Sequence, residues 1–361
     1  MKIGIITMHQ VLNCGSALQA YALQRKISEL GFEAEIIDYQ FYNHKVKSIK
    51  EFLRRLLTAA KRSKFRKFYD KYFNLSKQKY DKESIKQNPP DYDIYCTGSD
   101  QVWNPRFIEN DTNFMLSFAP DNKPRFSFAA SFTAGEIPEK YIPLYKEHLS
   151  KYKFISVREQ SGVKIIRQLI DRKANLVCDP TLLLNDTQWS ELASKRQCNE
   201  KYILVYVLGY MFNVRPKVYD IIDKVQSELG YKVYYLNPSI KQEYSKKNKK
   251  LILNYGPEDF INYFKNASFV ITDSFHGTVF SAIFNKPVLS VVEDKSNAKD
   301  GRISTILKEI GGEQSLTEYD KVSAFKASET EKYKVDQVAL ERYRNRSVAM
   351  LGKMLEEFKK N

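Results

Sequence analysis

The block with the clearest chemistry is DSFHGT, residues 273–278, which follows an apolar run and precedes small residues typical of a helix. This order predicts His276 at a helix N-terminus, beside Gly277, where backbone can approach a ligand closely. A phosphate or carboxylate there would meet backbone N–H groups, the hydroxyls of Ser274 and Thr278, and an imidazole that can carry a proton near pH 7. We therefore predict an anion site; a structural, hydrogen-bonded histidine is the alternative.

Two arginines are candidate partners for such an anion. Arg302 follows Gly301 in a predicted loop beyond the next strand, and Arg158 directly follows the apolar run KFISV. A guanidinium group recognises phosphate and carboxylate through paired hydrogen bonds. Either side chain could equally be an ordinary surface arginine.

A second candidate is the loop TMHQVLNCGS, residues 7–16, which joins the first predicted strand to a helix. Its end at a helix N-terminus favours an anion or a cluster of hydroxyl groups, with Ser16 as the expected N-cap. A plain strand-to-helix turn is the alternative, and the absence of GxGxxG argues against ordinary dinucleotide binding. The ligand-binding candidates here are His9, Asn13, Ser16 and Gln19.

The loop TGSDQVWNP, residues 97–105, also follows an apolar strand directly. Polar side chains at the carboxyl end of a strand are well placed for a ligand. Trp103 offers a flat face to a sugar ring, with Asp100, Gln101 and Asn104 as hydroxyl partners and Ser99 beside them. In the alternative interpretation Ser99 and Asp100 only cap the next helix, and Trp103 belongs to the core.

These loops need a scaffold of alternating strands and helices. Apolar runs predict strands at 2–7, 33–39, 92–97, 125–130, 153–157, 202–208, 232–237, 268–273 and 287–292. Amphipathic stretches predict helices at 16–30, 216–229, 259–265, 277–284 and 335–358, the first stopped by Gly31. This alternation predicts an α/β fold with parallel sheets, namely two Rossmann-like domains facing a cleft.

The length of 361 residues agrees with about two domains. We expect an N-terminal domain over residues 1–184 with a basic helical insertion at 45–85, and a C-terminal domain over 185–330. A polar linker is expected near 184–199, after the Asp179-Pro180 turn, and a long C-terminal helix within 331–361.

Several function classes are excluded or disfavoured. No HExxH, GxxxxGK[ST] or GxSxG motif occurs, so zinc protease, P-loop and hydrolase-elbow chemistry lack support. The four cysteines form no CxxC pair, and we expect no metal site. No apolar run reaches about 18 residues, and MKIGIITMHQ enters a strand without a signal peptide, so we expect a cytoplasmic protein.

The net charge of +15 is concentrated in one segment. Residues 45–80 hold 13 Lys or Arg and two acids, in an amphipathic pattern with one apolar and one basic face. A helical insertion packed on its domain, a helix attracted to anionic lipid, and a nucleic-acid-binding element are the three interpretations. No zinc finger, RNP sequence or KH loop supports nucleic acid, so none is expected as a partner.

Several ordered blocks over roughly residues 1–312 resemble the polysaccharide pyruvyl transferase family. They are GIITMHQVLNCGSALQAYALQ, GSDQVWNP, SVREQSG with CDPTLLL, and TDSFHGTVFSAIFNKPVLSV with GRIST. Their order and spacing together make the resemblance specific. Some members of the family carry Arg where this chain has Ser274, which removes one charge from the expected donor site.

The resemblance implies a GT-B-like fold and a phosphoenolpyruvate-dependent reaction that forms a cyclic pyruvate ketal on a sugar, without a cofactor. His276 would lie in the donor site of the C-terminal domain, as the acid or as a group polarising the leaving phosphate. Asp100, or less readily His9, would be the base toward the sugar in the N-terminal domain. The acceptor would be a lipid-linked oligosaccharide, with residues 45–80 contacting anionic lipid at the inner membrane face.

Two other function classes remain open from the sequence. A GT-B glycosyltransferase that uses a nucleotide sugar would have the same architecture, since fold does not determine function. A non-catalytic carbohydrate-binding protein would keep the polar loop around Trp103 and would not need His276. Preference for phosphoenolpyruvate or a nucleotide sugar separates the first two.

Overall fold

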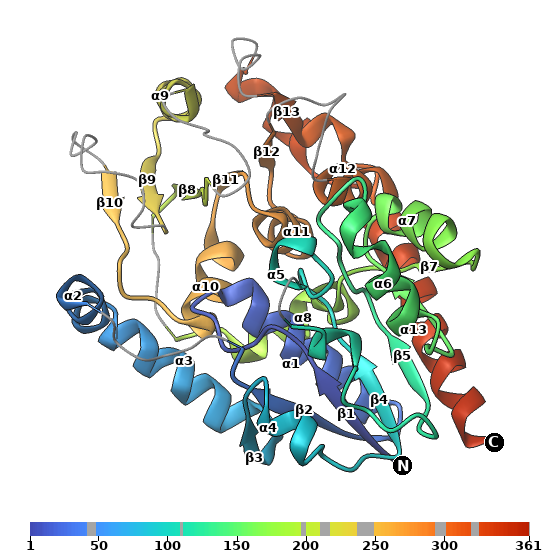
Figure 1. Cartoon of the computed structure of the whole chain (residues 1–361). Helices are drawn as coiled ribbons and strands as arrows, with labels where there is room; N and C mark the ends of the chain where they lie inside the picture. The colour runs from blue at the N-terminus through green and yellow to red at the C-terminus, as the bar shows by residue number, and fades with distance from the viewer. Residues whose placement is uncertain are drawn as a thin grey trace. The chain divides into compact units, whose positions relative to one another are not determined.

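The computed structural model describes residues 1–41, 48–108, 111–195, 200–209, 217–236, 249–292, 301–318 and 325–360 (Figure 1). The chain divides into two compact units. The N-terminal unit comprises Met1–Leu184 with Arg344–Asn361, and the C-terminal unit comprises Asn185–Tyr343. Each unit is built on its own parallel sheet.

The sheet of the N-terminal unit has the strand order β3-β2-β1-β4-β5. Its strands are β1 (Lys2–Ile6), β2 (Glu33–Tyr39), β3 (Leu75–Tyr80), β4 (Ile94–Thr97) and β5 (Arg125–Ser127). Every pair is parallel, and two further parallel strands, β6 (Ser156–Val157) and β7 (Asn175–Leu176), pair with each other. Isolated parallel bridges from Phe126 to Phe154 and from Ala130 to Val157 continue the sheet toward β6.

Helix α1 (Cys14–Glu29) connects β1 to β2 and is buried over most of its length. Its N-cap is Asn13, whose side-chain oxygen accepts from the N–H of Gly15, so the expected cap at Ser16 was wrong by three residues. The helix ends as expected before Gly31, which takes a left-handed φ of +85°. The other helices within residues 81–184 are α4 (Ser84–Gln87), α5 (Pro105–Ile108), α6 (Ile142–Leu149) and α7 (Gln160–Ile170).

The basic segment is only partly the helical insertion that its pattern predicts. Residues 42–47 lie outside the described part of the chain, and α2 (Ile49–Leu57) and α3 (Ala59–Tyr72) follow with a break at Thr58. Residues 75–80 then form strand β3 rather than helix. Because β3 is an edge strand with exposed Lys77, Gln78 and Lys79, it lacks the apolar run of the central strands.

The sheet of the C-terminal unit has the order β10-β9-β8-β11-β12-β13, with all pairs parallel. Its strands are β8 (Tyr202–Tyr206), β9 (Lys232–Tyr235), β10 (Lys249–Leu251), β11 (Phe269–Thr272), β12 (Val288–Val292) and β13 (Leu316–Glu318). Numbered within the unit, this is the 3-2-1-4-5-6 order of the Rossmann fold, as predicted.

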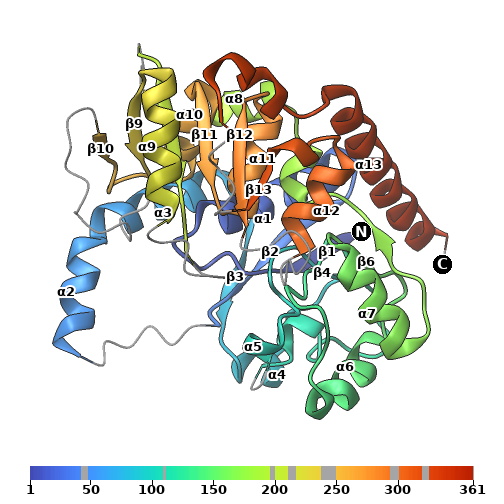
Figure 2. The same ribbon diagram turned by 90° about the horizontal axis from the view of Figure 1, so that it is seen from above.

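Helices cover both faces of this second sheet. Val218, Ile222 and Val225 of α9 (Lys217–Leu229) share a core cluster with Ile203 and Val205 of β8, and Figure 2 shows α9 along the sheet. On the other face, the Tyr206 ring contacts Phe260 of α10 (Pro257–Asn266). The remaining helices are α8 (Asp186–Leu192), α11 (Phe275–Ile283) and α12 (Gly301–Glu309). Helix α8 occupies part of the expected linker, because Asn185 and Gln188 form a capping box there.

The long C-terminal helix α13 (Gln337–Lys359) agrees with the predicted helix. From Arg344 onward it packs on the N-terminal unit: Arg344 Nε donates to Leu182 O at 2.6 Å, and Ser347 Oγ accepts from Cys178 N at 2.9 Å. The Phe358 ring contacts the rings of Phe126 and Phe154. Short 3₁₀ helices lie at Asn113–Met115, Glu139–Tyr141, Pro180–Leu183, Glu313–Ser315 and Ala327–Tyr333.

Candidate functional site

Each sheet has a point where the strand order reverses, and ligands of open parallel sheets bind outside the carboxyl ends of the strands there. In the N-terminal unit this point lies between β1 and β4, and in the C-terminal unit between β8 and β11. The segments singled out from the sequence, 7–16, 97–105 and 273–278, contain the loops 7–13, 98–104 and 273–274, which follow β1, β4 and β11. The fold therefore places all three at switch points.

At the second switch point, Asp273 bridges the two central strands. Its two carboxylate oxygens accept from the N–H groups of Leu208 and Gly209, which follow β8, at 2.7 Å each. The next residue, Ser274, is the N-cap of α11 and accepts from Gly277 N at 3.4 Å. These contacts hold the start of α11 at the carboxyl edge of the sheet.

His276 lies in the first turn of α11 and is 7% exposed. The guanidinium carbon of Arg302 lies 5.9 Å from the centre of the neighbouring Phe275 ring. Arg302 is the second residue of α12, which corrects its expected position in a loop. The first turn of α11 thus carries the imidazole of His276, and the guanidinium group of Arg302 lies near the adjacent Phe275 ring. A helix N-terminus with such groups favours an anion.

In the N-terminal unit, a buried polar cluster surrounds Asp100, whose φ of +78° is left-handed. Its carboxylate accepts from Ser16 Oγ at 2.5 Å and from Gln101 N at 2.9 Å. Arg158 lies 3.4 Å from Asp100 Oδ1 and 2.7 Å from Asp179 Oδ2. The cluster ties the loops after β1, β4 and β6 together.

A second group of polar residues lies beside the carboxyl ends of β1 and β2. His9 Nε2 lies 3.6 Å from Asp38 Oδ1, and Gln10 Nε2 donates to the same oxygen at 2.6 Å. Tyr69 Oη, from α3, donates to His9 O at 2.6 Å. Asp38 was not among the residues predicted from the sequence, although an acid near the end of the strand EAEIIDY was the available signal.

The sequence of this chain matches the family model described as polysaccharide pyruvyl transferase over residues 13–295. The chain belongs to that family. The match includes most of both units, with the loops 98–104 and 273–274, and it begins at residue 13, the last residue of the loop after β1. No curated protein matches the chain.

Solved structures show that this pyruvyl transferase family member has a GT-B-like fold. A Listeria monocytogenes protein assigned as a UDP-N-acetylglucosamine 2-epimerase superposes with a TM-score of 0.59 at 14% identity, over 99% of this chain and 97% of that chain. The UDP-GlcNAc 2-epimerase of Methanocaldococcus jannaschii, in complex with UDP-GlcNAc and UDP, gives 0.55 at 15% identity, over 99% and 100%. At such low identity the likeness shows the fold alone.

Several of the residues predicted to bind a ligand instead form contacts with other residues of the protein. Trp103 is 0% exposed in the core, and its Nε1 lies 3.3 Å from Phe114 O, so the expectation of a free face for a sugar was wrong. Asn104 and Gln101 bond to each other at 3.0 Å, and Asn104 also accepts from Arg106 N. Gln19 Nε2 donates to Thr7 Oγ1 at 2.8 Å and is fully buried. These four residues shape the loops from within.

Three further predicted residues also have structural contacts. Ser99 Oγ contacts Ala129 O at 2.8 Å and Asp179 Oδ2 at 2.9 Å. Thr278 Oγ1 lies 2.8 Å from Ser290 Oγ and joins α11 to β12. Arg158 was expected at the donor site, yet its two carboxylate contacts place it in the N-terminal cluster around Asp100.

Gly277 is required for packing on the strand beneath it. A Cβ at Gly277 would lie 2.2 Å from Thr272 Oγ1, which donates to Tyr206 O at 2.6 Å and so cannot easily rotate away. We therefore expect Gly277→Ala to destabilise the protein by about 1–3 kcal/mol, the usual cost of overpacking. Denaturant unfolding should show this loss, whereas Gly135→Ala, with no atom within 4 Å of its Cβ, should stay within about 0.5 kcal/mol of wild type.

Asp38 gives the N-terminal unit a dependence on pH. Burial alone would raise the pKa of Asp38, but hydrogen bonds from His9 and Gln40 and the charge of Lys79 hold that pKa below its usual value of 3.8. Because the unfolded chain binds this proton more tightly, the stabilisation is present above about pH 4 and is lost as pH falls through the folded-state pKa. The Tm gap between wild type and Asp38→Asn, measured across pH 2–7, should therefore shrink below about pH 4; a gap of constant size would contradict this role of Asp38.

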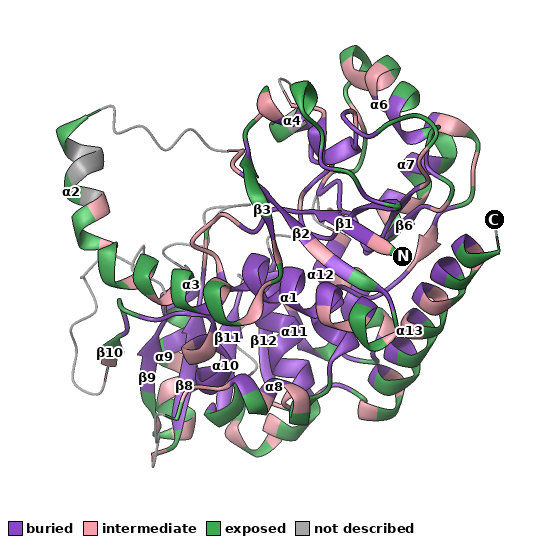
Figure 3. Cartoon of the chain, turned by 90° about the horizontal axis from the view of Figure 1, so that it is seen from below, coloured by how far each residue is buried: buried purple, intermediate pink, exposed green. Residues whose placement is uncertain are grey.

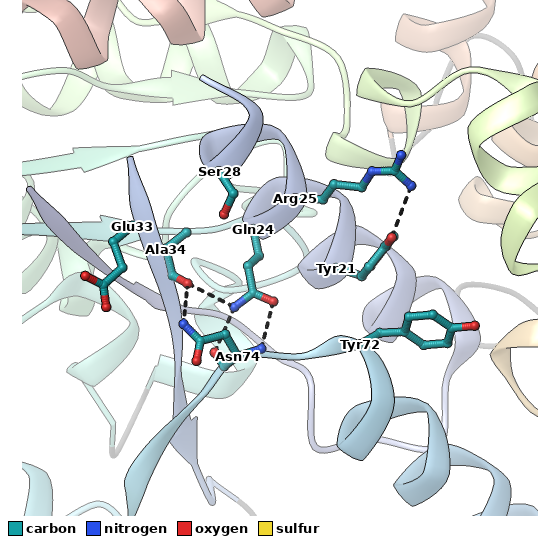
Figure 4. Close-up of a pocket in the computed structure, with 8 residues that line it drawn as sticks. All are labelled: Tyr21, Gln24, Arg25, Ser28, Glu33, Ala34, Tyr72 and Asn74. Carbon is teal, nitrogen blue, oxygen red and sulfur yellow. Dashed lines mark hydrogen bonds between the residues drawn. The ribbon is translucent and has the colours of Figure 1, made fainter. Parts of the chain in front are cut away.

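Two cavities lie at opposite ends of the strands of the N-terminal sheet. One, of about 320 Å³, lies beside Glu33 and Ala34 at the amino end of β2, where Gln24 and Asn74 bond to each other and to Ala34 O (Figure 4). The other, of about 390 Å³, is lined by Gln10, Asp38 and Lys79 near the carboxyl ends of β1, β2 and β3. Only the second lies at the edge where parallel sheets bind ligands.

Within the described part of the chain, no three or more His, Cys, Asp or Glu side chains gather in a way that could hold a metal ion. Among the same residues, no helix is long and apolar enough to cross a membrane.

Proposed function

We propose that the protein transfers the enolpyruvyl group of phosphoenolpyruvate to two hydroxyls of one sugar. In this reaction the donor carbon C2 gains two C–O bonds to the sugar and loses its bond to the phosphate oxygen. One hydroxyl proton goes to the methylene carbon, which becomes a methyl group, and the other leaves with phosphate. The product is a cyclic pyruvate ketal, so no oxidant, reductant or cofactor is consumed.

The observation that best supports this proposal is the arrangement of polar and basic groups at the N-terminus of α11. Phosphoenolpyruvate bears a phosphate and a carboxylate, and the first turn of α11 offers N–H donors beside His276, with Arg302 close to Phe275. In this proposal Arg302 supplies a positive charge, while Ser274 and Gly277 fix the helix start that the donor approaches. His276 gives a proton to the donor or polarises the leaving phosphate.

The acceptor hydroxyls need a base, and the proposed base is Asp100. Its Oδ2 already accepts from Ser16 Oγ, so a sugar hydroxyl bonded to Ser16 could pass its proton along this contact. General acid–base help of this kind contributes typically about 10²–10⁴-fold to a rate. His9 is the second choice, because its ring already lies between Thr7 O and the Asp38 carboxylate.

We infer a sugar of a surface-polysaccharide repeat unit as the acceptor, carried on a lipid at the inner face of the cell membrane. The family match supports polysaccharide synthesis as the setting, and the basic segment of the chain supports contact with anionic lipid. A cytoplasmic protein with peripheral membrane contact would meet such an acceptor where it is made.

Calorimetric titration with phosphoenolpyruvate tests the proposal, with UDP-sugars titrated in parallel. Saturable binding of phosphoenolpyruvate that weakens in Arg302→Gln but not in exposed Arg167→Gln would support the donor site. Binding of a UDP-sugar without any response to phosphoenolpyruvate would instead favour a nucleotide-sugar glycosyltransferase.

A further inference from the structure

The cavity at the carboxyl ends of β1, β2 and β3 has a strongly basic rim. Arg62 and Arg66 of α3, Arg55 of α2 and Lys79 of β3 line it, against two carboxylates, Asp38 and Asp70. Its volume of about 390 Å³ falls in the usual range for a small-molecule site. The cavity thus combines a net positive charge with the position at which parallel sheets bind ligands.

One face of α3 supplies much of this lining. Arg62, Phe65, Arg66, Tyr69 and Asp70 follow helical i, i+3, i+4 spacing and all line the cavity. Phe65 is buried and Tyr69 Oη bonds to His9 O, so the helix that bears the arginines is anchored on the unit. The two arginines themselves are exposed and accessible to a ligand.

We propose that this cavity binds the phosphate or diphosphate of a phosphate-linked sugar. A guanidinium group can bind two phosphate oxygens at once through two parallel hydrogen bonds. The four cationic and two carboxylate side chains in the lining give a formal charge of about +2, which matches a doubly negative ligand. The identification of this ligand as the acceptor rests on the proposed function. The prediction that the cavity binds a phosphate or diphosphate does not depend on it.

The neighbouring helix indicates that the ligand is anchored in a membrane. Helix α2, which supplies Arg55 to the cavity, exposes Ile49, Leu53, Leu56 and Leu57 to 80%, 54%, 58% and 87%. Their spacing of i, i+4, i+7 and i+8 places them on one helix face. Figure 3 shows the described turns of α2 as mostly exposed, unlike the core elements of the same unit.

The exposed apolar face of α2 and the exposed cations near it suit contact with an anionic lipid surface. Helices of this kind lie in the interface with the apolar face in the acyl region and the basic residues at the headgroups. Lys67 and Lys71 of α3 are exposed and add to this basic surface. A lipid-linked diphosphate sugar would then present its charged group to the cavity while its chain stays in the bilayer.

The cavity is tested by calorimetric titration of the whole protein with inorganic pyrophosphate, in the presence of saturating phosphoenolpyruvate. Arg62→Gln/Arg66→Gln should weaken pyrophosphate binding at least about tenfold, because two charge-assisted contacts are lost. The matched pair Lys164→Gln/Arg167→Gln, exposed on α7, should change it less than about twofold. Equal binding in all three proteins would overturn the site.

The membrane contact is tested by flotation with vesicles of phosphatidylcholine alone or mixed with phosphatidylglycerol. Leu53→Ser/Leu57→Ser should reduce binding to the mixed vesicles at least about tenfold and leave pyrophosphate affinity unchanged. Vesicle binding that is the same for the variant and for vesicles without phosphatidylglycerol would refute the proposed membrane contact of α2. Tighter binding of UDP than of pyrophosphate, without vesicle binding, would identify a soluble nucleotide diphosphate instead.

These measurements do not depend on the proposed reaction. If phosphoenolpyruvate fails to bind, the pyrophosphate and vesicle results still decide the cavity and the α2 face. If pyrophosphate binds equally well without Arg62 and Arg66, the proposed cavity site fails, and the proposed donor site at α11 is still tested separately by phosphoenolpyruvate binding.

Discussion

Replacing His276 with Ala is expected to lower kcat by about 10²–10⁴-fold while the protein stays folded. The side chain lies in the first turn of α11, beside the cap at Ser274 and the ring of Phe275, which Arg302 covers. Removing the imidazole takes away the proposed proton donor but leaves the N–H groups of the turn. Phosphate release with phosphoenolpyruvate and an acceptor glycan measures the loss.

Two further variants separate chemistry from structure at this position. His276→Gln keeps a polar side chain that can hydrogen-bond but cannot carry the proton, so it should be nearly as slow as the alanine variant. His148→Gln removes another buried histidine, on α6 of the N-terminal unit, and should retain kcat. Full turnover in His276→Ala would refute the assignment, and a raised KM with unchanged kcat would reduce His276 to a binding residue.

The central strands of both sheets could be predicted because they are buried on both faces. The run YILVYVL is apolar throughout, SFVITD has the apolar centre FVI, and β8 and β11 lie within these two runs. The short β7 of the two-stranded sheet was missed, and so were β3, β10 and β13, which lie at the edges of the two larger sheets. Their sequences, LSKQKY, KKL and LTE, contain charged residues that an edge tolerates and a local pattern therefore cannot reveal.

The candidate sites were predictable to the level of the loop, but not of each side chain. Strand–loop–helix order places residues 7–13, 98–104 and 273–274 at the switch points, as the structure shows. Which polar side chains point inward depends on contacts between segments far apart in sequence. Trp103 packs on Phe132 and Tyr152, and Tyr69 reaches His9 across 60 residues. No local spacing contains that information.

Breaking the buried ion pair of Arg158 is expected to cost about 3–5 kcal/mol of unfolding free energy. Arg158 is 2% exposed, and its guanidinium lies 2.7 Å from Asp179 and 3.4 Å from Asp100. In Arg158→Met the methionine fills most of the space, but the Asp179 carboxylate loses its counter-charge while it remains buried. Urea unfolding measures the cost, which Arg158→Met/Asp179→Asn should partly restore because the uncompensated charge is gone.

The matched control is Arg167→Met, which breaks the exposed pair with Asp171 at 3.2 Å and should cost only about 0–1 kcal/mol. The comparison also decides what Arg158 does. If Arg158 acts in donor binding, Arg158→Met weakens phosphoenolpyruvate binding with little loss of stability. If it holds the loops after β1, β4 and β6 together, stability falls and phosphoenolpyruvate affinity of the folded protein is retained. The contacts with both carboxylates favour the second result, because a guanidinium already bonded within its own unit has little capacity left for a ligand.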